Sequence, residues 1–453
     1  MPGFMRIGAA VASTLILLAP AIWNRFPLLQ YDTGGYLARW FEGYLVPSRS
    51  TAYGLFLTFF AQPDFWPVVI IQAALTVWVL ALVLRVYGFG GRPLLLLGVT
   101  AALSIFTTLP WLSSILLTDV FAGLAVLGLH LLVFADGALR RWERNALIAL
   151  VAFAVAAHGA TLAVIVVLLA LAALAWWLFR AGTAAGILRG AAALVLGAAL
   201  LVGANYVTSG RAVWTPGGVA LAFGRMLQDG IVHRYLAEHC PDKRLRLCAH
   251  QHELPTDADV YFWGETVFDR LGRFKGLDEE MRTIVLDSLR AYPAWQAEAA
   301  FVAAARQFVR VATGEGVVRH AWHSQGMIER HTPAANAGMR AARQQRGDLG
   351  FSAINRLHRP VALASMLLLL AIALMGWRRE SYADLGSLAA KATVVLLGNA
   401  VICGVLANPH DRYGARMVWI APLVVTLLLC RLYAQTVRSR IAAGPAAGPI
   451  PPA

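Results

Sequence analysis

Charged residues are scarce in this chain. They make up only 14% of its 453 residues, whereas 58% are hydrophobic. Soluble domains usually carry about a quarter charged residues, so this balance excludes an ordinary soluble protein and indicates a membrane protein. Acidic residues are the rarer kind, with 25 Asp and Glu against 39 Lys and Arg. Each carboxylate that borders an apolar run therefore needs a physical explanation.

Patterns of alternating polar and apolar residues are also lacking. Instead, apolar runs of roughly 18 to 22 residues recur, which is the length that a helix needs to cross the hydrocarbon core. Strands of a membrane barrel alternate and are about half as long. We therefore expect an all-α polytopic transmembrane helical bundle. Counting the runs predicts ten spans, at 7–23, 66–87, 93–109, 115–135, 146–157, 161–179, 190–207, 360–377, 392–407 and 417–430.

The chain lacks a basic stripe with interleaved aromatic residues, so its net charge of +14 does not indicate nucleic acid binding. Its arginines lie mainly in short loops between apolar runs. Placing both termini in the cytoplasm puts most of these arginines on the cytoplasmic side, as membrane proteins prefer. One alternative is that Ala19-Pro20-Ala21 acts as a signal-peptidase site and that the first helix is removed.

Cysteine is rare, with four residues in the chain. Cys403 and Cys430 lie within apolar runs and are interpreted as small core residues. Cys240 and Cys248, in "CPDKRLRLC", would fit a short disulfide loop if their segment faces an oxidising compartment. The alternative is a pair of unrelated reduced thiols.

The distribution of polar residues predicts four parts. Residues 1–207 form an N-terminal transmembrane module that includes an outer loop at 24–65. Residues 208–359 are polar enough for a mostly helical extracytoplasmic domain, inserted between spans seven and eight. Residues 360–440 form a C-terminal transmembrane module. Residues 441–453 are rich in Pro, Gly and Ala, which predicts a disordered tail.

Ionisable residues are nearly absent from the interiors of the predicted spans and gather at one membrane face. Asp32 lies in the first outer loop, in "QYDTGGYL", and Asp119 lies at the outer end of the fourth span. His158 lies in the outer turn between spans five and six. The turn "NPHDRYGAR" at 408–416 joins spans nine and ten on the same side.

Each of these residues also has a local interpretation. Asp32 and Asp119 could cap helices, His158 could be a hydrogen-bonded turn residue, and Arg412 and Arg416 could extend to the membrane interface. However, polar groups near the hydrocarbon boundary are costly unless they face a cavity or one another. We therefore expect the four turns to form one shared site.

A carboxylate beside arginines near the outer leaflet suits a reaction between an anionic lipid-linked donor and a hydroxyl acceptor. Arginines bind phosphate oxygens by charge-assisted hydrogen bonds, often two at a time. A carboxylate can take the acceptor's proton as a general base. Sugars are carried across bacterial membranes on polyprenyl phosphate, because nucleotide sugars stay in the cytoplasm. The pattern therefore favours transfer of a lipid-linked sugar.

These segments resemble the GT-C superfamily, polytopic glycosyltransferases that use lipid-phosphate sugars. "QYDTGGYL" looks like the first outer loop of that superfamily, with Asp32 in the acidic position. "SRSTAYGLFLTFF" is similar to its Arg followed by a Pro/Gly/Tyr-rich turn, and matches at Arg49, Tyr53 and Gly54. "LLTD", ending at Asp119, resembles the acidic residue that opens a later span. "HDRYGARMVWIAPL" resembles the aromatic and basic turn before the last helix.

The resemblance implies an inverting glycosyltransferase at the outer face of the bacterial inner membrane. It would move a sugar from a polyprenyl-phosphate donor to a glycan, lipid or protein acceptor of the cell envelope. Asp32 would act as the base, Asp119 would orient the base or the acceptor, and the segment 208–359 would recognise the acceptor. The residues expected to bind the donor phosphate are Arg49, Arg412 and Arg416. The residues expected to contact substrates are Tyr31, Tyr36, Tyr53, His158, His410, Asp411 and Tyr413.

No acidic-x-acidic motif occurs in the first outer loop, so the resemblance leaves a divalent metal possible without requiring one. No other cofactor is expected. The expected partners are membrane lipids and the two substrates.

Three alternatives remain at this level. A transporter or flippase would need polar residues near the membrane midplane, whereas the predicted span interiors are nearly free of charge apart from His130, towards the cytoplasmic end of the fourth span. A pure scaffold would need no site. An O-antigen-ligase-like transferase would use the polar segment "RHAWHSQGMIERH" for substrate or metal binding, although a solvated helix face is a competing interpretation. The residues concerned are Arg319, His320, His323, Arg330 and His331.

Overall fold

The computed structural model describes residues 2–43, 47–215 and 218–442. These residues form helices joined by short loops, and they contain no β-strand, although Leu28 and Ile115 pair in one isolated parallel bridge. The all-α prediction is confirmed. The tail predicted at 441–453 lies almost entirely outside the described residues.

Six helical segments in the described chain are long and apolar enough to cross a membrane. They contain α5 (Trp66–Leu84), α10 (Gly159–Phe179), α11 (Ala184–Ser209), α21 (Ser352–Arg378), α22 (Ala383–Leu406) and α23 (Asp411–Val418) with α24 (Ile420–Ala442). Shorter apolar helices are α1 (Pro2–Leu17), α6 (Pro93–Phe106) and α8 (Asp119–Phe134), and α9 (Arg141–Ala157) lies beside α8 and α11. Each of the ten predicted spans overlaps one of these helices. That all ten cross the membrane remains a prediction.

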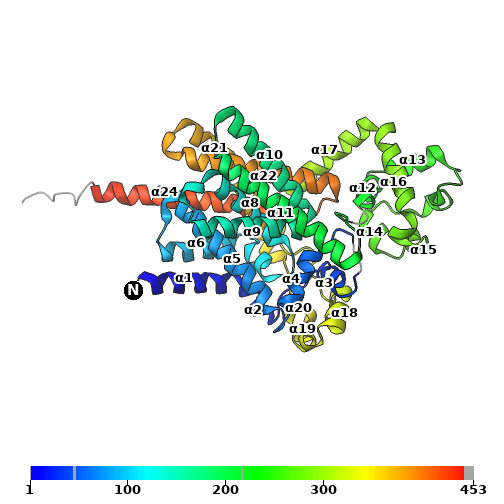
Figure 1. The fold of residues 1–453 in the computed structure, drawn as a ribbon, viewed down its shortest axis with the longest axis horizontal. Coiled ribbons are helices and arrows are strands. Elements are labelled where there is room, and N and C mark those ends of the chain that lie inside the picture. Colours follow the sequence, from blue (N-terminus) through cyan, green and yellow to red (C-terminus); the bar gives the residue numbers. More distant parts are fainter. Residues whose placement is uncertain (1, 44–46, 216–217, 443–453) are drawn as a thin grey trace, which may run out of the picture.

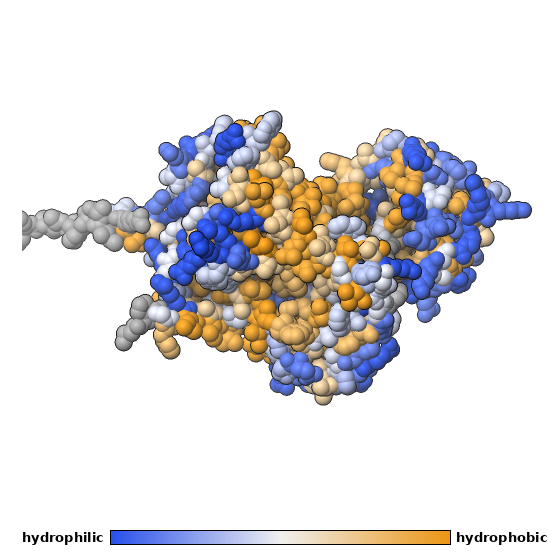
Figure 2. All heavy atoms as spheres, in the orientation of Figure 1, coloured by the Kyte–Doolittle hydropathy of each residue, from blue (hydrophilic) through white to orange (hydrophobic). Residues whose placement is uncertain are grey.

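The surface of the bundle separates polar from apolar residues along its long axis. On the face that Figure 2 shows, apolar residues predominate in a band across the middle of the molecule, and hydrophilic residues are more frequent towards its two ends. Most of the helices in this band lie roughly along the long axis (Figure 1). An apolar band of this kind fits a hydrocarbon layer, so the chain is a membrane protein.

A separate helical lobe forms the end of the molecule that lies away from the N-terminus (Figure 1). It consists of α12 (Gly218–Gln228), α13 (Ile231–His239), α14 (Ala258–Trp263), α15 (Val267–Arg270) and α16 (Arg273–Ala291). These helices enclose their own hydrophobic core, which includes Phe223, Tyr261 and Met281. A disulfide joins Cys240 to Cys248 within the lobe.

The segment predicted as one domain, 208–359, contributes to two cores. Its first part builds the lobe, whereas Val311, Met327 and Met339 are buried in the main core of the bundle. Helix α17 (Pro293–Val309) connects the two parts and packs along α22. The lobe is therefore continuous with the bundle through a long helix.

Two loops that lead into the candidate site are joined by backbone hydrogen bonds. The Leu28 N–H donates to the Ser114 carbonyl at 2.9 Å, and the Leu116 N–H donates to the Leu28 carbonyl at 2.9 Å. The loop at 115–118 connects α7 (Leu109–Ser114) to α8. These bonds hold the loop before Asp32 against the loop before Asp119, although the two residues are far apart in sequence.

A close contact between α8 and the chain after α23 depends on a glycine. A Cβ atom on Gly123 would lie 2.6 Å from Cζ2 of Trp419, whose side chain is fully buried. The indole N–H of Trp419 donates to the Arg416 carbonyl at 3.1 Å. Gly123 therefore allows the packing that holds the end of α23.

We predict that Gly123→Ala destabilises the protein, because the rigid indole ring and the helix backbone must separate. Overpacking of this kind costs about 1–3 kcal/mol. Thermal unfolding in a non-ionic detergent measures the effect. Gly98→Ala is the matched control, because nothing lies within 4 Å of a Cβ at Gly98 in α6. A Gly123→Ala protein as stable as the control would contradict this account of the packing.

Candidate functional site

Asp32 lies between two arginines from distant parts of the chain. One carboxylate oxygen of Asp32 accepts a hydrogen bond from Arg412 Nη1 at 2.6 Å, and the other accepts one from Arg49 Nη2. Asp32 precedes α3 (Thr33–Phe41), yet its side chain makes no capping hydrogen bond with that helix. The local interpretation of Asp32 as a simple helix cap is therefore wrong.

The two arginines reach Asp32 because of local features of the chain. Arg49 directly precedes Ser50, which caps α4 (Thr51–Phe59) by accepting a hydrogen bond from the Tyr53 N–H. Gly35 faces the Arg49 side chain, and a Cβ there would lie 3.1 Å from Arg49 Cγ. Gly35 thus leaves room for the Arg49 side chain beside α3.

The three charged side chains are neither fully exposed nor fully enclosed. The exposed fractions of the Asp32, Arg49 and Arg412 side chains are 11%, 16% and 12%. Burial raises the pKa of Asp32. The positive charges of Arg49 and, to a smaller extent, Arg412 outweigh this effect and lower the pKa to about 2. Asp32 is therefore an anion at neutral pH, and a small ligand can still reach the group.

Asp119 is the first residue of α8 and lies behind Arg412. Its Oδ2 atom is 3.4 Å from Arg412 Nε, and its side chain is 1% exposed. Neither of its carboxylate oxygens has a hydrogen-bond partner among the described residues. Asp119 is therefore a buried carboxylate whose charge is compensated by the nearby Arg412, without a hydrogen bond from any described residue.

Arg416 lies in a second layer behind Arg412 and is fully buried. Its guanidinium donates to Asn399 Oδ1 at 2.8 and 3.2 Å and contacts His158 Nδ1 at 3.1 Å. Its Nη2 atom also lies 3.2 Å from the sulfur of Cys403. Arg416 and His158, both predicted to bind substrate, are thus occupied with each other and with α22.

The Arg412 turn is held by residues that the sequence analysis did not select. The Gln307 side chain forms two hydrogen bonds with the His410 backbone, at 2.8 and 2.9 Å, and Arg310 Nη1 donates to the Pro409 carbonyl at 2.7 Å. Glu315 accepts the Arg412 N–H at 2.7 Å. The segment after α17 therefore fixes the position of Arg412.

His410 connects this turn to the lobe. Its Nδ1 atom lies 3.0 Å from Glu315 Oε1, and its Nε2 atom lies 3.3 Å from Asp259 Oδ2 in α14. Burial lowers the pKa of His410, but the two carboxylates outweigh it and raise this pKa to about 9. Burial raises the pKa of Glu315, yet the hydrogen bonds from His410 and the Arg412 N–H keep it below its usual value. At neutral pH, His410 is therefore a cation between two anions.

A local signal could have identified Glu315. It lies between Gly314 and Gly316, both of which have positive φ angles of 96° and 77°. The Gly316 carbonyl accepts a hydrogen bond from the Tyr31 N–H at 3.3 Å, next to Asp32. A carboxylate between two glycines marks a tight turn that brings the backbone close to another segment.

The predicted aromatic and acidic contacts differ in their exposure. Tyr31 is 58% exposed beside Asp32, whereas Tyr36 and Tyr53 are buried with their rings in edge contact at 5.0 Å. Tyr413 lies 5.1 Å from the Arg412 guanidinium, measured to the ring centroid. Asp411 accepts a hydrogen bond from the Ala312 N–H at 2.8 Å and thus holds the turn. Of these residues, Tyr31 is the one most open to a ligand.

The polar segment at 319–331 lies largely in α18 (Trp322–His331), which packs on α3. The Ser324 hydroxyl accepts the Gly34 N–H at 2.9 Å, so this helix covers the loop that carries Asp32. Arg330 and His331 contact Glu42. Arg319 donates to His320, and His323 is half-buried. Within the described residues, no group of three or more His, Cys, Asp or Glu could hold a metal ion.

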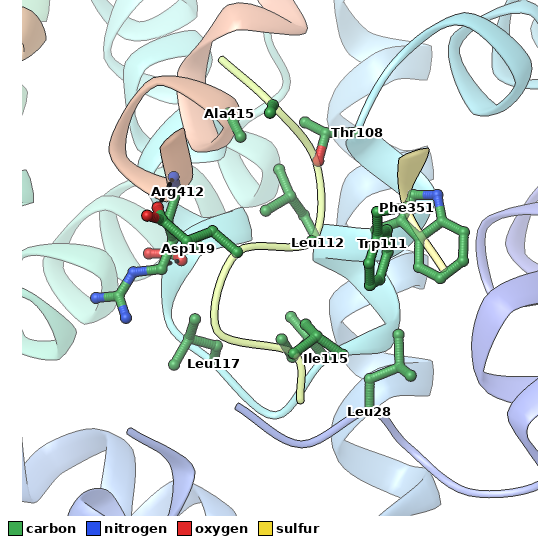
Figure 3. A pocket seen from close by; sticks show the side chains of 14 residues that line it. Leu28, Thr108, Trp111, Leu112, Ile115, Leu117, Asp119, Phe351, Arg412 and Ala415 are labelled. Atoms are coloured by element: carbon green, nitrogen blue, oxygen red, sulfur yellow. Dashed lines mark hydrogen bonds and ion pairs between the residues drawn. The ribbon is translucent and has the colours of Figure 1, made fainter. Parts of the chain in front are cut away.

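A narrow cavity adjoins the charged cluster and has two unlike ends. Asp119 and Arg412 lie on one side, and Trp111 and Phe351 lie on the other (Figure 3). Leu112 and Ile115 line the wall between them. The Trp111 and Phe351 rings meet edge to face at 4.9 Å. The cavity, of about 30 Å³, is therefore lined by charged groups at one end and by apolar groups at the other.

We predict that the His410 contacts stabilise the protein in a pH-dependent way. Folding raises the pKa of His410 above its usual value of about 6.5. The stabilisation is therefore complete below about pH 6.5 and is lost as the pH rises through about 9. At pH 6, the free energy of unfolding of His410→Gln should be roughly 1–3 kcal/mol smaller than that of the parent protein. At pH 10 the two proteins should be equally stable.

Thermal unfolding between pH 6 and pH 10 measures this difference. His252→Gln is the control, because His252 is exposed on the lobe and contacts its neighbour Gln251. The same stability gap at both ends of the pH range would contradict the assignment of a charged His410.

No protein-family model matches this chain, and no curated protein or solved structure matches it.

Proposed function

We propose that this protein is an inverting glycosyltransferase that moves a sugar from a polyprenyl-phosphate donor to an acceptor hydroxyl of the cell envelope. The observation that carries the proposal is the Asp32 carboxylate between Arg49 and Arg412, beside a cavity with one charged and one apolar end. A carboxylate base and paired guanidinium groups are parts that this reaction requires.

The site is proposed to face the outer side of the bacterial inner membrane, with ten spans and both termini in the cytoplasm. The excess of loop arginines at the other end supports this orientation. The lobe lies at the same end as the site, because Asp259 of the lobe contacts His410. A disulfide between Cys240 and Cys248 suits an oxidising compartment on that side.

The donor phosphate is proposed to bind Arg49 and Arg412. Planar guanidinium groups match pairs of phosphate oxygens, and the partial burial of both side chains limits screening by water. Trp111 and Phe351, at the apolar end of the cavity, would then contact the first part of the isoprenoid chain. Arg416 supports this arrangement from behind, since Asn399 and His158 already occupy its guanidinium.

In the reaction, the acceptor oxygen attacks the anomeric carbon of the sugar from the face opposite the phosphate. A new C–O bond forms as the bond between that carbon and the phosphate oxygen breaks, and polyprenyl phosphate leaves with the electron pair. Asp32 takes the proton of the acceptor hydroxyl. Asp119 orients the acceptor or the base through its carboxylate oxygens, which make no hydrogen bond with the described residues. The anomeric configuration is inverted because one displacement occurs.

We predict that Asp32→Asn abolishes transfer while the protein still folds and inserts into the membrane. An amide has nearly the same shape as a carboxylate but cannot accept the proton, and loss of a general base typically costs a factor of 10²–10⁴ in rate. The measurement is mass spectrometry of surface glycans and lipid-linked sugars from a deletion strain that carries the parent or the variant gene.

Asp136→Asn is the matched control for this experiment. Asp136 also lies between two arginines, Arg144 and Arg189, but it follows the far end of α8. Its replacement should leave the glycans unchanged. Normal glycans with Asp32→Asn would rule out Asp32 as the base, and no glycan change in the deletion strain would rule out the proposed function. Uptake of a lipid or solute without chemical change would favour a transporter instead.

A further inference from the structure

The Asp32 carboxylate occupies both arginines that the proposed function assigns to the donor phosphate. Each of its oxygens accepts a hydrogen bond from a different guanidinium, one from Arg49 and one from Arg412. This two-oxygen, two-arginine arrangement is the one that a phosphate group would make with the same residues. The site therefore already contains an anion, supplied by the protein itself.

We propose that Asp32 and the lipid phosphate compete for Arg49 and Arg412, so that the donor releases Asp32 for its role as the base. This inference rests on the proposed function and concerns the order of events at that same site. It assigns two states to Asp32, one paired with the arginines and one free.

The charges make such an exchange possible. Asp32 contributes one negative charge, and a phosphodiester such as a polyprenyl-phosphate sugar also carries one. The leaving lipid phosphate is a monoester, which carries about −1.5 to −2 at pH 7. Replacing one anion by another on the two guanidinium groups keeps the local charge balanced, whereas adding a phosphate beside a paired Asp32 would bring like charges together in a partly buried site.

The exchange explains how a strongly paired carboxylate can serve as a base. While both arginines contact it, Asp32 has a pKa of about 2 and is a weak base. When the phosphate draws the arginines away, the remaining effect of burial raises the pKa of Asp32. The base therefore gains strength only when a donor is present, which predicts that the donor binds before the acceptor reacts.

The same competition assists product release. After transfer, the proton on Asp32 must leave before the next cycle. Once it has left, the carboxylate can again pair with Arg49 and Arg412 and displace the lipid phosphate. Asp119 does not make the same arrangement, because its ion pair joins Oδ2 to Nε of Arg412 at the longer distance of 3.4 Å.

We predict that removing the carboxylate strengthens phosphate binding. Purified protein in a polyoxyethylene detergent, which contains no phosphate, is titrated with farnesyl phosphate by calorimetry. Asp32→Asn should bind it at least tenfold more tightly than the parent protein, and Arg49→Gln should bind it at least tenfold more weakly. Titrations with farnesol and with inorganic phosphate separate the contributions of the lipid chain and of the phosphate group.

The double variant Asp32→Asn/Arg49→Gln keeps the test valid if Asp32→Asn alone does not fold. It removes one charge of each sign, so no extra cation remains. It should bind farnesyl phosphate at least tenfold more tightly than Arg49→Gln alone. Asp136→Asn serves again as the control, since its side chain is 14% exposed and contacts two arginines, and it should leave the affinity unchanged.

The outcomes distinguish this inference from the proposed function. If Arg49→Gln weakens binding but loss of Asp32 in either background leaves it equal or weaker, phosphate binds at the arginines without displacing Asp32, and the exchange is wrong. If neither Arg49→Gln nor Arg412→Gln changes the affinity, phosphate does not bind at this site. The proposed donor site then fails as well.

Discussion

The organisation of this protein depends on the cost of placing a carboxylate near the hydrocarbon boundary of a membrane. Such a group must be paired with cations or lie against water, because an isolated charge there is strongly unfavourable. At Asp32 both requirements are met in part: two arginines bind the carboxylate, and a small fraction of the side chain stays exposed. Arg412 is 380 residues away in sequence, so this pairing depends on the correct packing of most of the bundle.

Much of the remaining structure around the site serves to hold those arginines. The bridge between Leu28 and Ile115 fixes the loop before Asp32, and Gln307, Arg310 and Glu315 fix the turn before Arg412. In each of these contacts at least one partner is a backbone N–H or carbonyl group. The contacts therefore fix the backbone of both segments and do not depend on flexible side chains alone. A site of the proposed kind needs this rigidity, because small displacements of reacting groups are costly.

The sequence predicted the helical class and the membrane helices, because uninterrupted apolar runs have one main structural solution. It also predicted that Asp32, Asp119 and Arg412 gather, because polar residues at one end of successive spans must share one face of the membrane. It could not predict Glu315 and Asn399 as supports or Trp111 and Phe351 as cavity walls, since their roles arise from contacts between distant helices. The boundary at 208–359 followed polarity, whereas burial divides that segment between two cores.

The contact between His410 and Asp259 also has a consequence for how the lobe should be regarded. A module joined only by a linker could be exchanged or removed while the rest kept its geometry. Here α14 reaches the turn that carries Arg412, and α17 continues from the lobe into the helix packing of the bundle. Evolutionary changes in the lobe would therefore alter the Arg412 turn at the same time, so that the lobe and the charged site are inherited as a single unit.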